Sequence, residues 1–386
     1  MKGIEEKQIE APYELPEGWK WCRLGDVADC LDGFRKPINA TERAGRTGNV
    51  PYYGATGQVG WIDDFLTNEE LVLLGEDGAP FLDLIKEKAY LISGKAWVNN
   101  HAHILRSKYG EIGNRYLLNY LNIFNYSGYV NGTTRLKLTQ GEMLKIPFPL
   151  PPTLAEQQRI VNRIESMFAK LDEAKEKAQN VVDGFETRKA AILHKAFTGE
   201  LTAKWRKENG VSDDSWEEKR FDEFCLLKRG FDLPATQRIE GMYPLVSSSG
   251  IIDTHNEAKV KAPGIVTGRS GSIGKVFYIE EDFFPLNTTL YSQNLFGNNA
   301  RYVYYYLSNF DFKSFSSSTA VPTLNRNNFS KVELKVPTLP EQVEIVRILD
   351  ILIEKENKAK QAAEAVLEQI DLLKKSILAR AFRGEL

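Results

Sequence analysis

The sequence predicts an α+β protein in which two globular domains are separated by two long helices that form an antiparallel coiled coil, with a pseudo-two-fold internal repeat. Three observations predict this architecture. A helical segment occurs twice, each copy carries a heptad seam of apolar residues, and each follows a region of short strand candidates and turns. We expect a first domain over residues 1–151, a first helical region with its linker over 152–211, a second domain over 212–336 and a second helical region over 337–386.

The internal repeat is the strongest signal. Residues 153–201 and 338–386 align without a gap, and 19 of the 49 positions are identical, including the endings AFTGEL and AFRGEL. Weaker correspondences precede each copy: Trp19 with Trp216, residues 51–54 with 244–247, and 72–78 with 265–271. The chain is therefore two copies of one unit, each a variable domain followed by a helix.

The two helical segments carry apolar residues at alternating steps of four and three. That 3.5-residue spacing is typical of a left-handed coiled coil. Thr153 and Thr338 each precede a Glu by three residues and suit helix N-caps, while Gly199 and Gly384 suit C-terminal positions. The predicted seam consists of Ile160, Ile164, Met167, Leu171, Ala174, Ala178, Val181, Phe185 and Ile192 in the first copy, and Ile345, Leu349, Leu352, Ala359, Ala363, Val366, Ile370, Leu373 and Ile377 in the second.

We expect the two seams to pack against each other. Near-identical segments in one chain favour this pairing over the alternative that each helix packs only on its own domain. An antiparallel arrangement then follows from the chain order, and a seam from Ile160 to Ile192 is about 48 Å long. In this register Ala174 faces Ala363 and Ala178 faces Ala359.

The globular domains contain short apolar segments separated by Gly-, Asn- and Ser-rich turns. Residues 70–74, 262–267 and 275–278 are strand candidates. An aromatic-rich helix candidate follows in each domain, over residues 115–124 and 300–307. The aromatic residues are so dense within one short helix that we assign them to the core rather than to a base-stacking platform.

Composition narrows the function classes. No apolar run is long enough to span a bilayer, and residues 1–12 lack a signal-peptide core, so we expect a cytoplasmic protein. Cys22, Cys30 and Cys225 form neither a disulfide framework nor a zinc motif. His101 and His103 have no acidic or Cys partner at motif spacing, so no metal site is expected. Complete phosphate-binding, hydrolase, metalloprotease and adenine-methylase motifs are absent, which argues against a stand-alone enzyme.

Polar and basic segments in both domains are candidates for contacting DNA. Residues 283–331 hold four basic residues and one acid, with many Asn, Gln, Ser and Thr between them. Such side chains contact base edges and phosphates. The candidates are Arg35, Lys36, Thr133, Thr134, Arg135 and Lys137 in the first domain, and Arg269, Ser270, Asn287, Thr288, Asn325 and Arg326 in the second. A net charge of -2 implies that positive potential is confined to one face, and that a partner supplies part of the phosphate grip.

The doubled helical motif resembles a known family. Each copy opens with Pro-x-Leu-x-Glu-Gln, at residues 152–157 and 337–342, and closes with Phe-x-Gly-Glu-Leu, at 197–201 and 382–386. Together with the alternating variable domains, these motifs resemble the specificity subunits of Type I restriction-modification systems.

The resemblance implies a function and a set of partners. Each domain would be a target-recognition domain that reads one half of a bipartite, asymmetric site in double-stranded DNA. The helices would set the spacer between the halves and dock two methylation subunits. This chain would have no catalytic residue and bind no cofactor or metal itself. S-adenosylmethionine would be held by the methylation subunits, and restriction subunits using ATP and Mg would complete the nuclease.

A coiled-coil scaffold that joins two recognition domains for ligands other than DNA is the alternative. It has the same helices and the same duplicated domains. Salt-sensitive, sequence-selective binding to DNA together with the methylation partner would exclude it.

Overall fold

The computed structural model describes residues 11–317 and 322–386. Residues 1–10, where no signal peptide is expected, and residues 318–321, within the basic segment of the second domain, lie outside the described residues. The chain divides into two compact units: unit 1 comprises Met1–Gln179 and Ala363–Leu386, and unit 2 comprises Asn180–Ala362. We call the globular parts of these units the first and the second domain.

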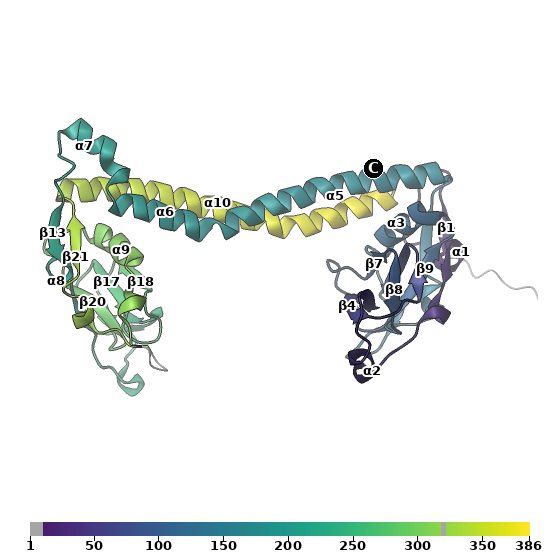
Figure 1. Cartoon of the computed structure of the whole chain (residues 1–386), viewed down its shortest axis with the longest axis horizontal. Helices are drawn as coiled ribbons and strands as arrows, with labels where there is room; N and C mark the ends of the chain where they lie inside the picture. Colours follow the sequence, from purple (N-terminus) through teal and green to yellow (C-terminus); the bar gives the residue numbers. More distant parts are fainter. Residues whose placement is uncertain (1–10, 318–321) are drawn as a thin grey trace, which may run out of the picture. The chain divides into compact units, whose positions relative to one another are not determined.

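The first domain, drawn in purple and blue in Figure 1, contains two four-stranded sheets. One is antiparallel in the order β2-β9-β6-β7; the other has the order β4-β3-β8-β5, with β3 and β8 parallel. Pairs β1-β12 and β10-β11 complete the strands. The bounds are β1 Lys20–Arg23, β2 Ala28–Cys30, β3 Val50–Gly54, β4 Gly57–Ile62, β5 Thr67–Asn68, β6 Leu71–Gly75, β7 Ala89–Ile92, β8 Lys95–Val98, β9 Ala102–Ser107, β10 Val130–Asn131, β11 Lys137–Leu138 and β12 Pro147–Leu150.

The second domain repeats this plan. Its antiparallel sheet has the order β14-β20-β17-β18, its second sheet has the order β16-β15-β19 with β15 and β19 parallel, and β13 pairs with β21. The bounds are β13 Glu217–Arg220, β14 Leu226–Arg229, β15 Tyr243–Ser247, β16 Gly250–His255, β17 Gly264–Gly268, β18 Val276–Ile279, β19 Phe284–Pro285, β20 Thr289–Asn294 and β21 Glu333–Val336.

The matching strand orders confirm the internal repeat. The three weak sequence correspondences fall on or beside β1 and β13, β3 and β15, and β6 and β17. Each domain also has a short helix after its first strand, α1 (Leu24–Val27) and α8 (Phe221–Phe224). The predicted α+β class with a duplicated unit is therefore confirmed.

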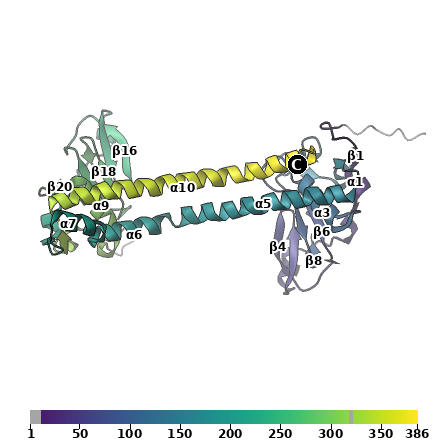
Figure 2. The same ribbon diagram turned by 90° about the horizontal axis from the view of Figure 1, so that it is seen from above.

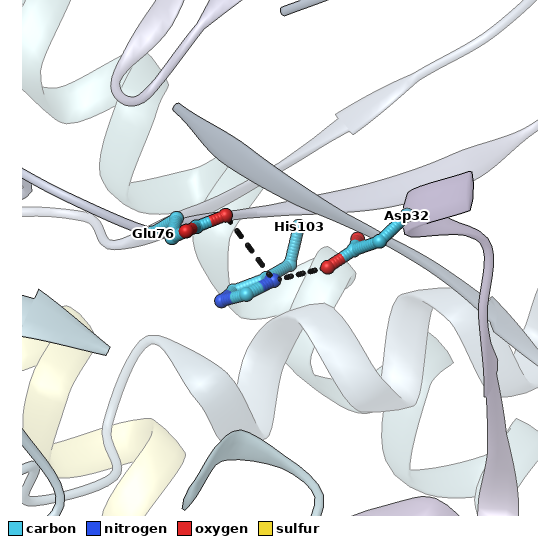
Figure 3. A group of neighbouring side chains, drawn as sticks. All are labelled: Asp32, Glu76 and His103. Carbon is cyan, nitrogen blue, oxygen red and sulfur yellow. Dashed lines mark hydrogen bonds and ion pairs between the residues drawn. The ribbon is translucent and has the colours of Figure 1, made fainter. Parts of the chain in front are cut away.

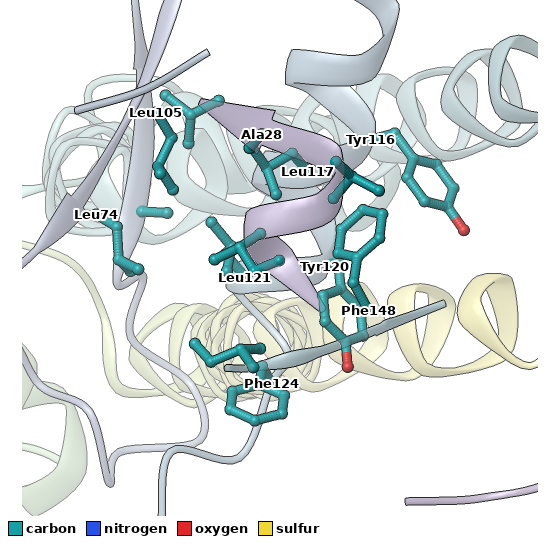
Figure 4. Close-up of a cluster of buried hydrophobic side chains, with 14 of the residues drawn as sticks. Ala28, Leu74, Leu105, Tyr116, Leu117, Tyr120, Leu121, Phe124 and Phe148 are labelled. Atoms are coloured by element: carbon teal, nitrogen blue, oxygen red, sulfur yellow. The ribbon is translucent and has the colours of Figure 1, made fainter. Parts of the chain in front are cut away.

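The aromatic helices α3 (Gly110–Leu121) and α9 (Ala300–Asn309) supply core residues, as predicted. In Figure 4 the side chains of Tyr116 and Tyr120 lie among the aliphatic residues of the first core. Their hydroxyls donate to the carbonyl oxygens of Pro149 at 3.0 Å and Pro147 at 2.6 Å, so burial leaves neither unsatisfied. The remaining short helices of the first domain are α2 (Ala40–Ala44) and α4 (Gln140–Met143).

The helical regions contain α5 (Leu154–Asp183), α6 (Phe185–Phe197), α7 (Ala203–Asn209) and α10 (Leu339–Phe382). The backbone amide of Glu156 donates to Thr153 Oγ1 at 3.2 Å, which confirms that Thr153 caps α5. Gly199 and Gly384 follow α6 and α10 with φ of 81° and 73°, which confirms them as helix-terminating glycines. Within the described residues no helix joins sufficient length with sufficient apolarity to cross a bilayer.

In unit 1, α5 and the C-terminal part of α10 lie side by side (Figure 2). Asp172 pairs with Lys374 at 2.6 Å and Lys175 with Asp371 at 3.7 Å, so the residue numbers run in opposite directions and the helices are antiparallel. Both helices also pack into the core of the first domain, through Ile160, Val161 and Ile164 of α5 and Leu378, Ala381 and Phe382 of α10.

In unit 2, α6 packs against the N-terminal part of α10. Arg188 Nε donates to Glu356 Oε2 at 2.8 Å. Leu193 of α6 shares the core of the second domain with Ile345 and Leu349 of α10. In each unit, therefore, an antiparallel pair of helix segments shares a hydrophobic core with one globular domain.

Three predicted seam positions of α10 are wrong. Val366 and Leu373 are 41% and 47% exposed, and Ala359 is also exposed. In each case the following residue is half-buried instead, namely Lys360, Leu367 and Lys374. At these three places the buried side of α10 therefore continues four residues after the preceding seam position, where three residues were predicted.

Aromatic rings on the partner helix explain this shift. The ammonium group of Lys360 lies 4.9 Å from the ring centroid of Phe185, and that of Lys374 lies 5.1 Å from that of Phe168. A lysine stem covers an apolar surface while its charge interacts with the ring face. A count of apolar residues assigns lysine to the outside and misses this packing.

The predicted alanine pairing is also wrong. Lys175 pairs with Asp371, so its neighbour Ala174 is level with Leu372 in the antiparallel pair, about 14 Å along the helix from Ala363. Ala359 is exposed and does not form a helix interface. A heptad pattern repeats every seven residues, so it fits equally well when one helix is shifted by seven residues along the other. The ion pairs between the helices show which of these registers the structure has.

Replacing Ile370 by Ala should destabilise the protein by about 2 kcal/mol, because Ile370 is buried and a two-helix interface can collapse only partly. Val366→Ala, four residues earlier on the exposed side, is the matched control and should change stability by less than about 0.5 kcal/mol. Urea unfolding of both variants measures the difference. Equal losses would contradict the seam described above.

Candidate nucleic-acid interface

Equivalent loops follow the central strand of the main sheet in each domain. In the first domain, the backbone amide of Leu138 donates to the carbonyl of Glu76, just after β6, at 2.7 Å. In the second, the amide of Leu324 donates to the carbonyl of Arg269, just after β17, also at 2.7 Å. These bonds join each loop to a segment near the end of its domain, so the two sites can be compared position by position.

The first-domain site is built around two carboxylates and a histidine (Figure 3). A carboxylate oxygen of Asp32, a carboxylate oxygen of Glu76 and a ring nitrogen of His103 lie within 4.8 Å of one another. His103 Nδ1 lies 2.6 Å from Asp32 Oδ2 and 3.9 Å from Glu76 Oε2. Arg35 bonds Glu76 through Nη1 and lies 3.1 Å from Asp32 through Nη2, while Lys137 Nζ lies 3.1 Å from Glu76 Oε1.

Electrostatics keep both carboxylates ionised. Burial opposes ionisation of Glu76, but hydrogen bonds from Arg35 and Lys137 outweigh it and hold its pKa below the ordinary value. Burial likewise opposes ionisation of Asp32, but the hydrogen bond and charge of His103, the backbone amide of Ile104 and the charge of Arg35 together outweigh it and lower its pKa. Positive charge from protein side chains thus already occupies the space between the carboxylates. The expectation of no bound metal stays a prediction.

The remaining first-domain candidates lie nearer the surface. Asp77 binds both His101 at 2.7 Å and Arg135 at 2.9 Å. The other three candidates, Lys36, Thr133 and Thr134, are exposed. The chosen basic residues Arg35, Arg135 and Lys137 are therefore brought together, but each is ion-paired to an acidic residue just after β6.

The second-domain site is a cavity of about 590 Å³ with a basic lining. Of the predicted residues it contains Arg269, Asn325 and Arg326. The guanidinium of Arg326 donates to the carbonyl of Leu227 at 2.9 Å, which fixes its position at the rim. The lining residues are Lys228, Arg229, Gly230, Phe231, Asp232, Arg269, Leu290, Thr323, Leu324, Asn325 and Arg326.

Sequence reasoning missed Lys228 and Arg229, which end β14 and line this cavity. Both are exposed, and Arg229 Nη2 lies 3.1 Å from Asp232 Oδ1. A doubled basic residue at the end of a strand, next to the glycine of a turn, is the signal that could have found them. Composition over a long segment could not, because they lie outside residues 283–331.

The other predicted residues of the second domain shape its loop. The carbonyl of Thr288 accepts the backbone amides of Arg269 at 2.8 Å and Ser270 at 3.2 Å. The side-chain amide of Asn287 donates to Asp232. These contacts hold the backbone from which Arg269 extends into the cavity.

The two sites carry opposite charge at equivalent positions. His103 of β9 pairs with Leu74, the last residue but one of β6. Leu290 of β20 pairs with Thr267, the last residue but one of β17, so His103 and Leu290 occupy equivalent positions. The β2–β9 pairing ends at Cys30 with Leu105, and extending it by two residues sets Asp32 opposite His103, as Arg229 is set opposite Leu290. Arg269 follows β17 as Glu76 follows β6. One site is thus centred on carboxylates and the other on guanidinium groups, on one shared fold.

Comparison with known proteins places these sites in context. The family model described as "Type I restriction modification DNA specificity domain" matches twice, over residues 16–182 and 213–369. A putative type I restriction enzyme specificity subunit of Haemophilus influenzae is 26% identical over 380 residues, covering 91% of each chain.

Two solved structures share the fold. The HsdS subunit from Thermoanaerobacter tengcongensis matches with a TM-score of 0.65 and 18% identity, over 98% of this chain and all of that one. A chain from a structure concerning complex assembly and conformational transition of the type I R-M system matches with a TM-score of 0.71 and 17% identity, over 97% of this chain and all of that one.

Proposed function

The chain belongs to the Type I restriction-modification DNA specificity family, and from this premise we propose that its two domains read the two halves of one bipartite, asymmetric DNA site. The observation that carries the proposal is the exchange of Asp32 and Glu76 for Arg229 and Arg269 at equivalent positions. Identical domains would read identical half-sites. Because this exchange changes the charged groups that surround each site, the exposed side chains of the two sites differ and favour different bases, so the halves differ.

In the second domain, the cavity residues are the proposed contacts. Arg269 and Arg326 suit guanine, because a guanidinium donates two hydrogen bonds to its two acceptors, and Asn325 suits adenine, because the side-chain amide both donates and accepts. Lys228 and Arg229 suit the phosphate backbone at the rim. Ser270, Asn287 and Thr288 support these contacts by holding the loop.

In the first domain, exposed residues are the proposed contacts. Thr133, Thr134 and Arg135 lie on the loop before β11, and Lys36 lies beside Trp97 with its ammonium 5.9 Å from the ring centroid. Arg35 is only 16% exposed and holds Asp32 and Glu76 together. Its proposed role is therefore to hold these two carboxylates in position rather than to contact DNA.

The long helices are the proposed spacer and docking surface. Two similar helical stretches offer two similar surfaces, which suits two methylation subunits. Those subunits would carry S-adenosylmethionine and methylate adenine, and restriction subunits using ATP and Mg would complete the nuclease. This chain then supplies sequence recognition and its partners supply the catalysis.

Arg269→Ala should weaken recognition of one half-site by roughly 10- to 100-fold and leave the other half intact, because one bidentate base contact contributes about 1–3 kcal/mol. The measurement is methylation mapping with the assembled methyltransferase, followed by binding to duplexes with either half scrambled. Lys204→Ala, an exposed lysine on α7, is the control and should change neither half. Equal weakening at both halves would refute the assignment of one half to each domain.

A further inference from the structure

His103 has an arrangement of acceptors that fixes its protonation. Its side chain is 1% exposed. Nδ1 lies 2.6 Å from a carboxylate oxygen of Asp32 (Figure 3), and Nε2 lies 2.9 Å from the backbone carbonyl oxygen of Leu138. Ionised carboxylate and carbonyl oxygens only accept hydrogen bonds, whereas a neutral imidazole has one N–H. Both contacts are satisfied only when both ring nitrogens are protonated.

We infer that His103 is a buried imidazolium that positions the recognition loop of the first domain, residues 131–138, so that reading of the first half-site depends on its proton. This inference rests on the proposed function. His103 is a positioning residue, since it reaches the loop through the carbonyl of Leu138 rather than by contact with DNA.

The proton belongs to His103 rather than to Asp32. Asp32 Oδ1 accepts the backbone amide of Ile104 at 2.9 Å, and Oδ2 lies 3.1 Å from the guanidinium of Arg35. These donors stabilise the ionised carboxylate. The other charged groups around the ring are Glu76, 3.9 Å from Nδ1, and Lys137, which pairs with Glu76. The two carboxylates stabilise a cation at this position, and they share that role among His103, Arg35 and Lys137.

Loss of the proton would release the loop. Leu138 is held from both sides, because its carbonyl accepts from His103 and its amide donates to the carbonyl of Glu76. A neutral ring has a single N–H, so one of its nitrogens would face Leu138 or Asp32 with a lone pair. The carbonyl or the carboxylate on that side would then lose its hydrogen-bond donor. The candidate contacts Thr133, Thr134, Arg135 and Lys137 precede Leu138 directly.

The second domain provides an internal control. Leu290 stands at the position of His103, and Leu324 at that of Leu138. A leucine cannot titrate, so this link has no counterpart there. Any pH effect through His103 should therefore appear in one half-site only.

The first test needs no DNA. The full chain has four histidines, and labelling them with ¹⁵N lets proton-detected NMR count the ring N–H groups of each. We expect one buried ring, absent from the spectrum of His103→Gln, to show two N–H protons at neutral pH. A single N–H on that ring would overturn the inference whatever the proposed function proves to be.

The second test uses the assembled methyltransferase and a duplex carrying its mapped site. Raising the pH until the NMR spectrum shows a single N–H on the His103 ring should lower selectivity for the first half-site by roughly tenfold, with the second half unchanged. His103→Leu should show the low selectivity at every pH, whereas Lys204→Ala, at an exposed position of α7, should behave as wild type.

The outcomes separate the two proposals. Absence of half-site selectivity at any pH, with two ring N–H protons present, would refute the proposed function and spare the protonation state. Equal pH dependence in both halves, or a His103→Leu variant indistinguishable from wild type, would overturn the role of His103. The wild-type pH series stands even if His103→Leu fails to fold.

Discussion

Replacing Glu341 by Ala is expected to destabilise unit 2 by about 3 kcal/mol, because it removes the buried carboxylate of Arg206 and leaves the guanidinium only the exposed carboxylate of Asp213 at 3.0 Å. Glu341 is 0% exposed, and its Oε1 lies 2.7 Å from Arg206 Nη1. The same carboxylate accepts from the hydroxyl of Thr202 at 2.6 Å and from the indole of Trp216 at 3.0 Å. One side chain thus joins α10 to the segment that leaves α6 and to the start of the second domain.

The first repeat supplies a matched control for this prediction. Glu156 occupies the same motif position but pairs on the surface with Arg159 at 2.8 Å, so Glu156→Ala should cost less than about 1 kcal/mol. Calorimetry and urea unfolding measure both variants. The double variant Glu341→Ala/Arg206→Ala should lose less than the sum of the single variants, because it leaves neither charge alone. Similar losses for Glu341→Ala and Glu156→Ala would refute the buried-anchor role.

This contrast also marks what the sequence could predict. The motif Pro-x-Leu-x-Glu-Gln is the same in both copies, and it correctly predicted two helices with the same start. It could not predict that Glu341 is buried and Glu156 is not, because the partners of Glu341 come from residues 202–216, far from it along the chain. Periodicity detects local structure, whereas burial of a charge depends on distant segments.

Prediction of the helix seam was limited in the same way, because it depends on contacts with a distant segment of the chain. Apolar spacing predicted a helix pair and many of its buried positions, and the chain order predicted that the pair is antiparallel. The spacing nevertheless chose Leu373 over Lys374. The ring of Phe168 on the other helix decides between these neighbours. A pattern that treats every lysine as solvent-exposed cannot include that contact.

The candidate sites were predictable in the second domain more than in the first. Arg269, Asn325 and Arg326 were chosen from the sequence and line one cavity. In the first domain the chosen basic residues include Arg35, whose partners Asp32 and Glu76 neutralise it. Composition counts charges along the chain and cannot show which of them are paired in space.

Phe382→Ala is expected to destabilise unit 1 by about 3–5 kcal/mol, the range for removing a buried phenylalanine. Phe382 belongs to the second Phe-x-Gly-Glu-Leu motif at the end of α10, and its ring packs edge-on against Tyr116 at 5.0 Å and Tyr120 at 5.1 Å. Those rings belong to α3 of the first domain. The substitution leaves a cavity where the helix end meets the domain core, so it removes both packing and aromatic contacts.

Leu372→Ala is the control for this prediction, because Leu372 lies on the same helix but is 58% exposed, so its loss should stay below about 0.5 kcal/mol. Calorimetry of the full chain should show the transition of unit 1 at lower temperature in Phe382→Ala, with unit 2 little changed. A uniform shift of both units, or a loss no larger than that of Leu372→Ala, would contradict the role of Phe382 in joining α10 to the first domain. If the role holds, the same variant should weaken first-half recognition more than second-half recognition, since the domain that loses its helix contact is the one that reads the first half.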